Sequence, residues 1–134
     1  MSWKMLIAAM LCAGLSACAT WAPTWSEYNG SREYARAEIH VAPTVIDAVD
    51  GQNPGPRGYY GSYKVEPGQR TLSLEAPAIS PGWKGGTTPQ RLTLEMAPCK
   101  RYYIIAHYDN PLGTTWTPQV SYVEPIAGCM VASR

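Results

Sequence analysis

Six side chains in this sequence of 134 residues carry a thiol or an imidazole, and their spacing limits the chemistry they can do. They are Cys12, Cys18, Cys99, Cys129, His40 and His107. Zinc sites usually draw on closely spaced pairs of cysteines, and no two of these cysteines stand that close together. Neither histidine belongs to an H-E-x-x-H sequence or a similar ligand pattern. The sequence therefore predicts no metal site and no cofactor.

The sequence also lacks a recognisable catalytic set. It contains no G-x-S-x-G sequence and no glycine-rich loop that leads from a strand into a helix. His107 stands two residues before Asp109, but residues two apart on a strand share a face by geometry alone. We expect His40 and His107 to occupy unlike environments, each facing solvent from a strand. The prediction is a protein that is not an enzyme.

The first seventeen residues have the organisation of a secretory signal peptide. A short segment with Lys4 is followed by an apolar stretch from Met5 to Gly14, and then by small residues. About twenty apolar residues are needed to span a bilayer, so this stretch of roughly ten is too short to remain as a membrane helix. The sequence therefore predicts export of the chain.

The sequence Leu15-Ser16-Ala17-Cys18 resembles the lipobox of bacterial lipoproteins. The resemblance implies a diacylglyceryl group on the Cys18 thiol, cleavage just before Cys18, and acylation of the new amine. No aspartate follows Cys18, which in that family favours the outer membrane, with the domain in the periplasm. The chain is thus divided into a signal peptide (1–17), a lipidated tether (18–37) and a folded domain (38–134).

Two alternatives remain open for this region. Ala17-Cys18-Ala19 also fits an A-x-A cleavage site, which would discard Cys18 and release a soluble protein. The tether tryptophans, Trp21 and Trp25, either lie at the level of the lipid headgroups or pack back on the domain.

The two remaining cysteines form an even pair once Cys12 has left with the signal peptide and Cys18 carries lipid. Exported proteins fold in an oxidising compartment, so we predict a disulfide between Cys99 and Cys129. It would close a loop of about thirty residues and contribute roughly 3 to 4 kcal/mol in the chain-entropy model. The alternative is a pair of free, buried and inert thiols.

Alternating apolar and polar residues, with turn signals between them, predict short strands along the rest of the chain. About seven are expected, at residues 38–41, 45–49, 60–66, 71–75, 90–96, 101–108 and 115–123. The segment 101–108 is apolar on both faces and should be a central strand, while Pro118 places the last strand at an edge or a bulge. The prediction is an all-β fold, an antiparallel β-sandwich or open barrel.

Residues 63–74, which contain Val65-Glu66-Pro67-Gly68 and Leu72-Ser73-Leu74, resemble the hairpin of PEGA-type and related prealbumin-like surface modules. The alternation in 60–66 and in 71–75, on either side of Pro67-Gly68, itself predicts that these strands pair as a hairpin through a tight turn. Glycine in that turn would supply the positive φ at its third position.

The net charge and the aromatic residues limit the functions that the sequence supports. Without Lys4 the eleven Lys and Arg become ten, against ten Asp and Glu, which leaves no electrostatic footprint for nucleic acid. Trp83 and Trp116 stand in or beside loops, where they either form an aromatic binding surface or cover the open end of a sandwich.

The leading hypothesis is a non-enzymatic lipoprotein, anchored through Cys18, that binds an envelope protein or cell-wall glycan. An enzyme or enzyme accessory acting on the cell wall is the second hypothesis. The third is a periplasmic inhibitor or chaperone that uses a sheet edge.

Overall fold

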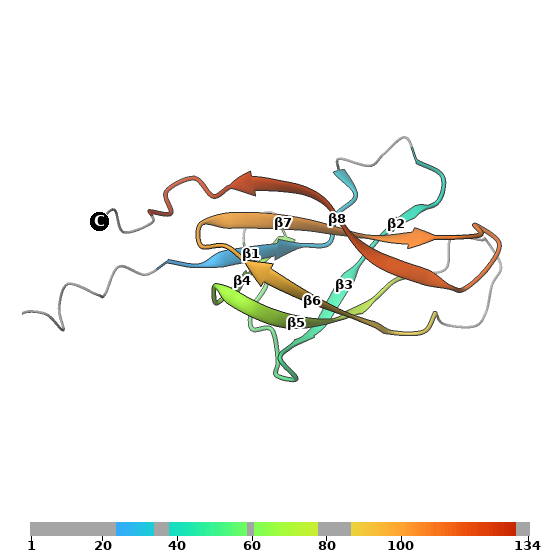
Figure 1. Cartoon of the computed structure of the whole chain (residues 1–134), viewed down its shortest axis with the longest axis horizontal. Coiled ribbons are helices and arrows are strands. Elements are labelled where there is room, and N and C mark those ends of the chain that lie inside the picture. Colours follow the sequence, from blue (N-terminus) through green and yellow to red (C-terminus); the bar gives the residue numbers. More distant parts are fainter. Residues whose placement is uncertain (1–23, 34–37, 59–60, 78–86, 131–134) are drawn as a thin grey trace, which may run out of the picture.

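The computed structural model describes residues 24–33, 38–58, 61–77 and 87–130. Those residues contain eight strands and no α-helix, so the predicted all-β sandwich or open barrel is confirmed. The strands are β1 (Ser26–Asn29), β2 (Val41–Pro43), β3 (Val45–Val49), β4 (Ser62–Val65), β5 (Gly68–Glu75), β6 (Gln90–Met96), β7 (Lys100–Tyr108) and β8 (Trp116–Pro125). They form two sheets, which we name the large sheet and the small sheet (Figure 1).

The large sheet has five strands and is built around β7. β8 pairs with β7 along one edge, while β1 and β2 pair with successive parts of its other edge, and β4 pairs with β1. The β1–β7 pair is parallel, and the other pairs are antiparallel. The predictions that 101–108 is a central strand and that the last strand lies at an edge are both confirmed.

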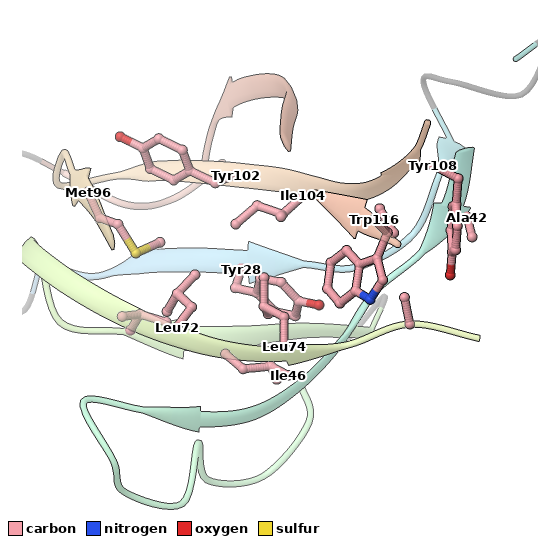
Figure 2. Packing of buried hydrophobic residues seen from close by; sticks show 13 residues of the cluster. Tyr28, Ala42, Ile46, Leu72, Leu74, Met96, Tyr102, Ile104, Tyr108 and Trp116 are labelled. Carbon is pink, nitrogen blue, oxygen red and sulfur yellow. The ribbon is translucent and has the colours of Figure 1, made fainter. Parts of the chain in front are cut away.

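The small sheet has three strands in the order β3-β5-β6, and its apolar face packs against the large sheet to form the core (Figure 2). The side chains at the centre of this core are Leu72, Leu74 and Met96 from the small sheet, and Tyr28, Ile104 and Trp116 from the large one. Burying a large apolar side chain contributes about 1.5 to 3 kcal/mol, so this layer is the main source of stability.

A buried chain of hydrogen bonds crosses this core. The Thr44 hydroxyl donates to the carbonyl of Ile104 over 2.7 Å, so the Tyr28 hydroxyl, 2.7 Å away, donates to Thr44. Burial raises the pKa of Tyr28 above its usual value. Gly30 must be glycine here, because a Cβ at that position would lie 1.9 Å from the carbonyl oxygen of Thr44.

The tether prediction for residues 18–37 is wrong over Ser26–Asn29. This segment is strand β1, which lies between β4 and β7 with all four residues buried, so the folded domain begins well before residue 38. Its polar residues can be buried because they find partners: Ser26 Oγ donates to the carbonyl of Ala97 over 2.7 Å, and Asn29 Nδ2 donates to Ser62 Oγ over 3.0 Å. A buried polar group with a partner avoids most of the cost of leaving water.

The predicted hairpin between strands 60–66 and 71–75 is also wrong. β4 pairs with β1 in the large sheet, whereas β5 pairs with β3 and β6 in the small sheet. Pro67-Gly68 therefore carries the chain from one sheet to the other. Gly68 does have a positive φ of 111°, as predicted, but it opens β5 and does not close a hairpin.

The first predicted strand, 38–41, is shifted along the chain. β2 begins at Val41, which is buried, while Ile39 is 73% exposed. Ile39 and His40 lie in a turn, so the apparent alternation before Val41 does not belong to a strand.

Candidate functional site

A row of four charged residues crosses the outer face of the large sheet, with one residue on each of four neighbouring strands. In the strand register Lys64 on β4 is opposite Glu27 on β1, Glu27 is opposite Arg101 on β7, and Arg101 is opposite Glu124 on β8. The signs alternate along the row, and its formal net charge is zero. We name these four residues the charge row.

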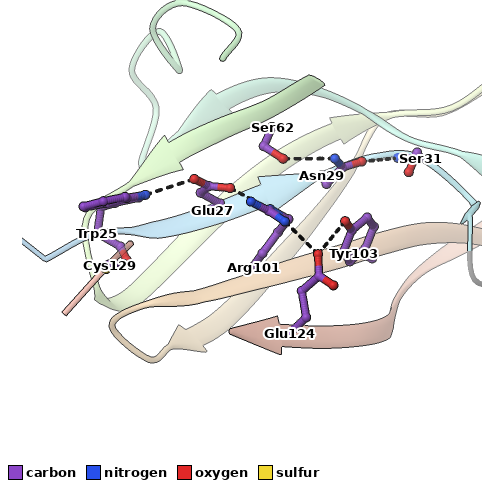
Figure 3. A network of polar contacts seen from close by, with 9 residues as sticks. All are labelled: Trp25, Glu27, Asn29, Ser31, Ser62, Arg101, Tyr103, Glu124 and Cys129. Carbon is purple, nitrogen blue, oxygen red and sulfur yellow. Dashed lines mark hydrogen bonds and ion pairs between the residues drawn. The ribbon is translucent and has the colours of Figure 1, made fainter. Parts of the chain in front are cut away.

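Arg101 is the centre of the charge row (Figure 3). Its Nε lies 2.6 Å from Glu27 Oε2 and its Nη1 lies 2.7 Å from Glu124 Oε1. The side chains of Arg101, Glu27 and Glu124 are only 20%, 11% and 21% exposed. Burial lowers the pKa of Arg101, but the hydrogen bonds to Glu27 and Glu124 outweigh it and leave that pKa above its usual value. The guanidinium is a permanent cation here.

Tyr103 supports the Glu124 end of the charge row. Its hydroxyl donates to Glu124 Oε1 over 2.7 Å, and its ring lies 6.2 Å from the ring of Tyr122. Burial and the hydrogen bond to Glu124 raise the pKa of Tyr103 to about 12. Glu124 Oε1 thus accepts hydrogen bonds from both a guanidinium and a phenol.

Trp25 supports the Lys64 end of the charge row. Its indole Nε1 donates to Glu27 Oε1 over 3.0 Å, and Lys64 Nζ lies 4.5 Å from the centre of its ring. A cation over a tryptophan ring is held by the electrostatics of the ring face. Of the two alternatives for the tether tryptophans, Trp25 packs back on the domain, while Trp21 lies outside the described residues.

Cys99 and Cys129 form a disulfide with their Cα atoms 5.3 Å apart, as the sequence predicted. Two backbone hydrogen bonds reinforce it: Cys99 N donates to the Trp25 carbonyl over 2.8 Å, and Ile126 N donates to the Cys99 carbonyl over 3.0 Å. The chain that follows β8 is therefore fixed beside Trp25.

A cavity of about 530 Å³ opens over the charge row. It is lined by all four charged residues, by the Trp25 ring, and by Ser62 and the segment Pro125–Ala127. Hydrogen-bond donors (Lys64, Arg101) and acceptors (Glu27, Glu124) alternate along its floor beside an aromatic ring. This arrangement suits a ligand with many hydroxyl or amide groups and no net charge.

The predicted aromatic binding surface is wrong for Trp116. This side chain is only 1% exposed, packs in the core, and donates from Nε1 to the Thr88 carbonyl over 2.9 Å. It closes the sandwich, which was the alternative given for it. Trp83 and Cys18 lie outside the described residues.

The two histidines do not occupy unlike environments. The rings of His40 and His107 lie together with their centres 6.3 Å apart and their planes 27° apart, because β2 pairs with β7 at this point. Both residues are half-buried, and Asp109 is exposed in the turn after β7. No group of three or more metal-ligating side chains occurs in the part of the chain that the structure describes.

The charge row itself was missed by the sequence analysis. Glu27 and Arg101 are 74 residues apart, and each looks like an ordinary solvated charge in its own segment. Only the pairing of β1 with β7 brings them together, and no short-range pattern signals that pairing.

Comparisons of the chain with models of protein families, with curated proteins and with solved structures found no match. Within the described ranges, no helix is long and apolar enough to cross a bilayer.

Proposed function

We propose that this chain is a lipid-anchored, non-enzymatic module of the bacterial cell envelope that binds an uncharged glycan in the cavity over the charge row. The signal-peptide pattern and the sequence Leu15-Ser16-Ala17-Cys18 support export and lipid attachment. The charge row and its cavity support the choice of ligand.

The observation that carries the proposal is the balance of the charge row. Each sugar hydroxyl both donates and accepts, so a glycan can bond to the Glu27 and Glu124 carboxylates and to the Lys64 and Arg101 cations at the same time. The exposed part of the Trp25 ring offers an apolar surface for the C–H groups of a sugar. A phosphate or another strong ion that is attracted to one residue of the charge row would be repelled by the residue of opposite sign on the neighbouring strand.

The arrangement of the two glutamates argues for binding without hydrolysis. Glycoside hydrolysis uses one carboxyl group as an acid that gives a proton to the leaving oxygen. Glu27 accepts hydrogen bonds from Trp25 and Arg101, and Glu124 accepts from Arg101 and Tyr103. Both carboxyl groups therefore serve as acceptors within the sheet.

The anchor would keep the cavity near the membrane. Seven residues, Ala19 to Trp25, separate Cys18 from β1. A chain of that length spans at most roughly 28 Å, so a ligand of the cavity has to come close to the lipid surface. A cell-wall glycan that passes near the membrane fits this limit.

The glycan proposal is tested by titrating the lipidated protein, held in detergent micelles, with a neutral chitin tetrasaccharide. We expect saturable binding in isothermal titration calorimetry, with quenching of tryptophan fluorescence in the wild type, and binding at least tenfold weaker in Trp25→Ala and Glu124→Gln. Glu95→Gln, an exposed site on the small sheet, is the matched control and should bind as the wild type does. Absent binding, or equal binding by all four proteins, would refute the choice of ligand.

The anchor is tested separately by mass spectrometry of the processed protein from the producing cells. We expect a chain that begins at Cys18 and carries acyl chains. A bare amino terminus at Thr20 would refute the anchor and leave the glycan proposal to stand on its own test.

A further inference from the structure

A second cavity meets the one over the charge row at Lys64. It has a volume of about 350 Å³, which is within the range of small-molecule sites, and we name it the loop cavity. The end of β3, the residues that follow it, and the chain between β4 and β5 form its walls. Lys64 on β4 lines both this cavity and the one over the charge row, so the two are neighbours.

The loop cavity repeats the chemistry of the charge row. Its charged residues are two acids and two bases, so their formal charges cancel: Asp50, Glu66, Lys64 and Arg70. Arg70 Nη1 lies 3.0 Å from Asp50 Oδ2, and Arg70 Nη2 lies 3.6 Å from Glu66 Oε2. Donors and acceptors again lie side by side on a surface without net charge, which suits a ligand with many hydroxyl or amide groups.

Two exposed carboxamides add to this surface. Gln52 and Asn53 follow β3 and line the loop cavity. The backbone of Gln52 exchanges two hydrogen bonds of 2.9 Å with Val49, and Asn53 Oδ1 accepts the Gly55 N–H over 2.8 Å. A carboxamide both donates and accepts, so it can bond to the hydroxyl and N-acetyl groups of a sugar.

Arg70 connects the two walls of the loop cavity. Its Nη1 donates to Asp50, which follows β3, while its Nε and Nη2 donate to the carbonyls of Glu66 and Pro67 over 2.9 and 3.0 Å. The Thr71 N–H also donates to Asp50 Oδ1 over 2.8 Å. The cavity is therefore formed before a ligand arrives, and a preformed site loses little conformational freedom on binding.

We infer that the two cavities form one elongated site, which binds a linear, uncharged glycan that crosses β4 at Lys64. This inference rests on the proposed function, because the glycan must bind over the charge row before its chain can continue into the loop cavity. The joined surface has four carboxylates and three cations, so it repels an anionic polymer: Glu27, Glu124, Asp50 and Glu66 against Lys64, Arg101 and Arg70. The site therefore prefers long neutral chains to short ones.

The inference is tested by calorimetric titration of the protein, purified from the producing cells into detergent micelles, with neutral chitin oligosaccharides of two to six units. We expect the hexasaccharide to bind at least thirtyfold more tightly than the disaccharide, because only the longer chain reaches both cavities. The alternative registers of a longer chain account for only a few-fold gain.

Variants of the loop cavity locate the additional contacts. Gln52→Ala and Asn53→Ala should each weaken binding of the hexasaccharide at least fivefold and leave binding of the disaccharide unchanged. Gln69→Ala removes an exposed carboxamide on β5, outside both cavities, and is the matched control. Trp25→Ala should weaken binding of both lengths, because Trp25 lines the cavity over the charge row.

The outcomes separate this inference from the proposed function. Equal affinity for the disaccharide and the hexasaccharide would overturn the elongated site and leave the glycan proposal standing. A preference for length that persists in both Gln52→Ala and Asn53→Ala would also overturn it, since the additional units would then lie elsewhere. Absence of binding at every length would refute the glycan proposal and this inference together. Thermal unfolding shows whether each variant is folded, and Gln52→Ala decides the question if Asn53→Ala is not.

Discussion

Polar residues differ in solvent exposure between the outer faces of the two sheets. On the small sheet the outward residues of β6, Arg91, Thr93 and Glu95, are all exposed to water. On the large sheet Glu27 and Asn29 are buried, and their polar groups bond to other side chains. Alternation in sequence therefore identifies the outer face only where that face meets solvent.

The difference has an energetic consequence. A polar group that faces water can be replaced with little effect, because water replaces its partner. A buried one leaves its partner unsatisfied, at a cost of about 1 to 3 kcal/mol, and more when the partner is charged. Matched substitutions on the two sheets should separate these cases.

The largest effect is expected from the disulfide, which belongs to the large sheet alone. The double variant Cys99→Ser, Cys129→Ser should lose about 3.5 kcal/mol of unfolding free energy, because the open chain has more freedom when unfolded. Denaturant unfolding measures the loss, and hydrogen exchange should quicken in β7 and β8 more than in β5. Reduced wild type should match the variant, and a loss under about 1 kcal/mol would contradict the prediction.

Removal of the central cation comes next. Arg101→Met leaves Glu27 and Glu124 poorly exposed to water and without their cation, and should cost about 3 kcal/mol. The control Arg91→Met on the small sheet should stay within about 0.5 kcal/mol of wild type. Similar losses for the two variants in urea unfolding would mean that the charge row contributes no special stability.

A smaller effect is expected at Tyr103. Tyr103→Phe removes one hydrogen bond to a carboxylate and should cost about 1.5 kcal/mol, while Thr93→Val removes an exposed hydroxyl contact and should cost less than about 0.5 kcal/mol. The pKa of Tyr103 is raised to about 12, so its contribution is complete below about pH 10 and disappears as pH rises through 12. If stability fell equally in wild type and Tyr103→Phe over this pH range, the predicted contribution of Tyr103 would be contradicted.

The smallest effect on stability is expected at Asp50, which directly follows β3 of the small sheet. The backbone N–H of Thr71 and then Arg70 hold the pKa of this exposed carboxyl below its usual value of 3.8. Its small contribution to stability is therefore present above that value and is lost as pH falls through the lowered pKa. In an NMR titration Arg70→Gln should raise the pKa only part of the way, because the Thr71 N–H remains. A complete return to the usual value would contradict this ranking of causes.

The sequence predicted the parts of the fold that follow a simple period. Leu72 and Leu74 alternate with polar residues and are fully buried, and the apolar segment that became β7 is central. The cysteine count and the predicted export signal together led to the Cys99–Cys129 pair. Each of these inferences depends on neighbouring residues or on simple counting.

The missed parts depend on partners far away in sequence. Ser26-Glu27-Tyr28-Asn29 has no apolar alternation, and it becomes a buried strand only because Ala97, Arg101 and Ser62 satisfy its polar groups. The chain does bend at Pro67, but the sheet that each flanking strand joins is decided by long-range pairing, so the predicted tight turn of a hairpin does not form. The charge row was unpredictable for the same reason.

The parallel pairing of β1 with β7 sets the order in which the molecule can be completed. β1 is the first of the described strands to be synthesised, yet its neighbours β4 and β7 follow about 35 and 75 residues later. Contacts between segments so far apart form slowly, because a long loop must close first. β1 can pair with β4 after about 35 further residues, but its second edge has to wait about 75 residues for β7. A chaperone that shields residues 26–29 should therefore speed folding more than one that shields the small sheet.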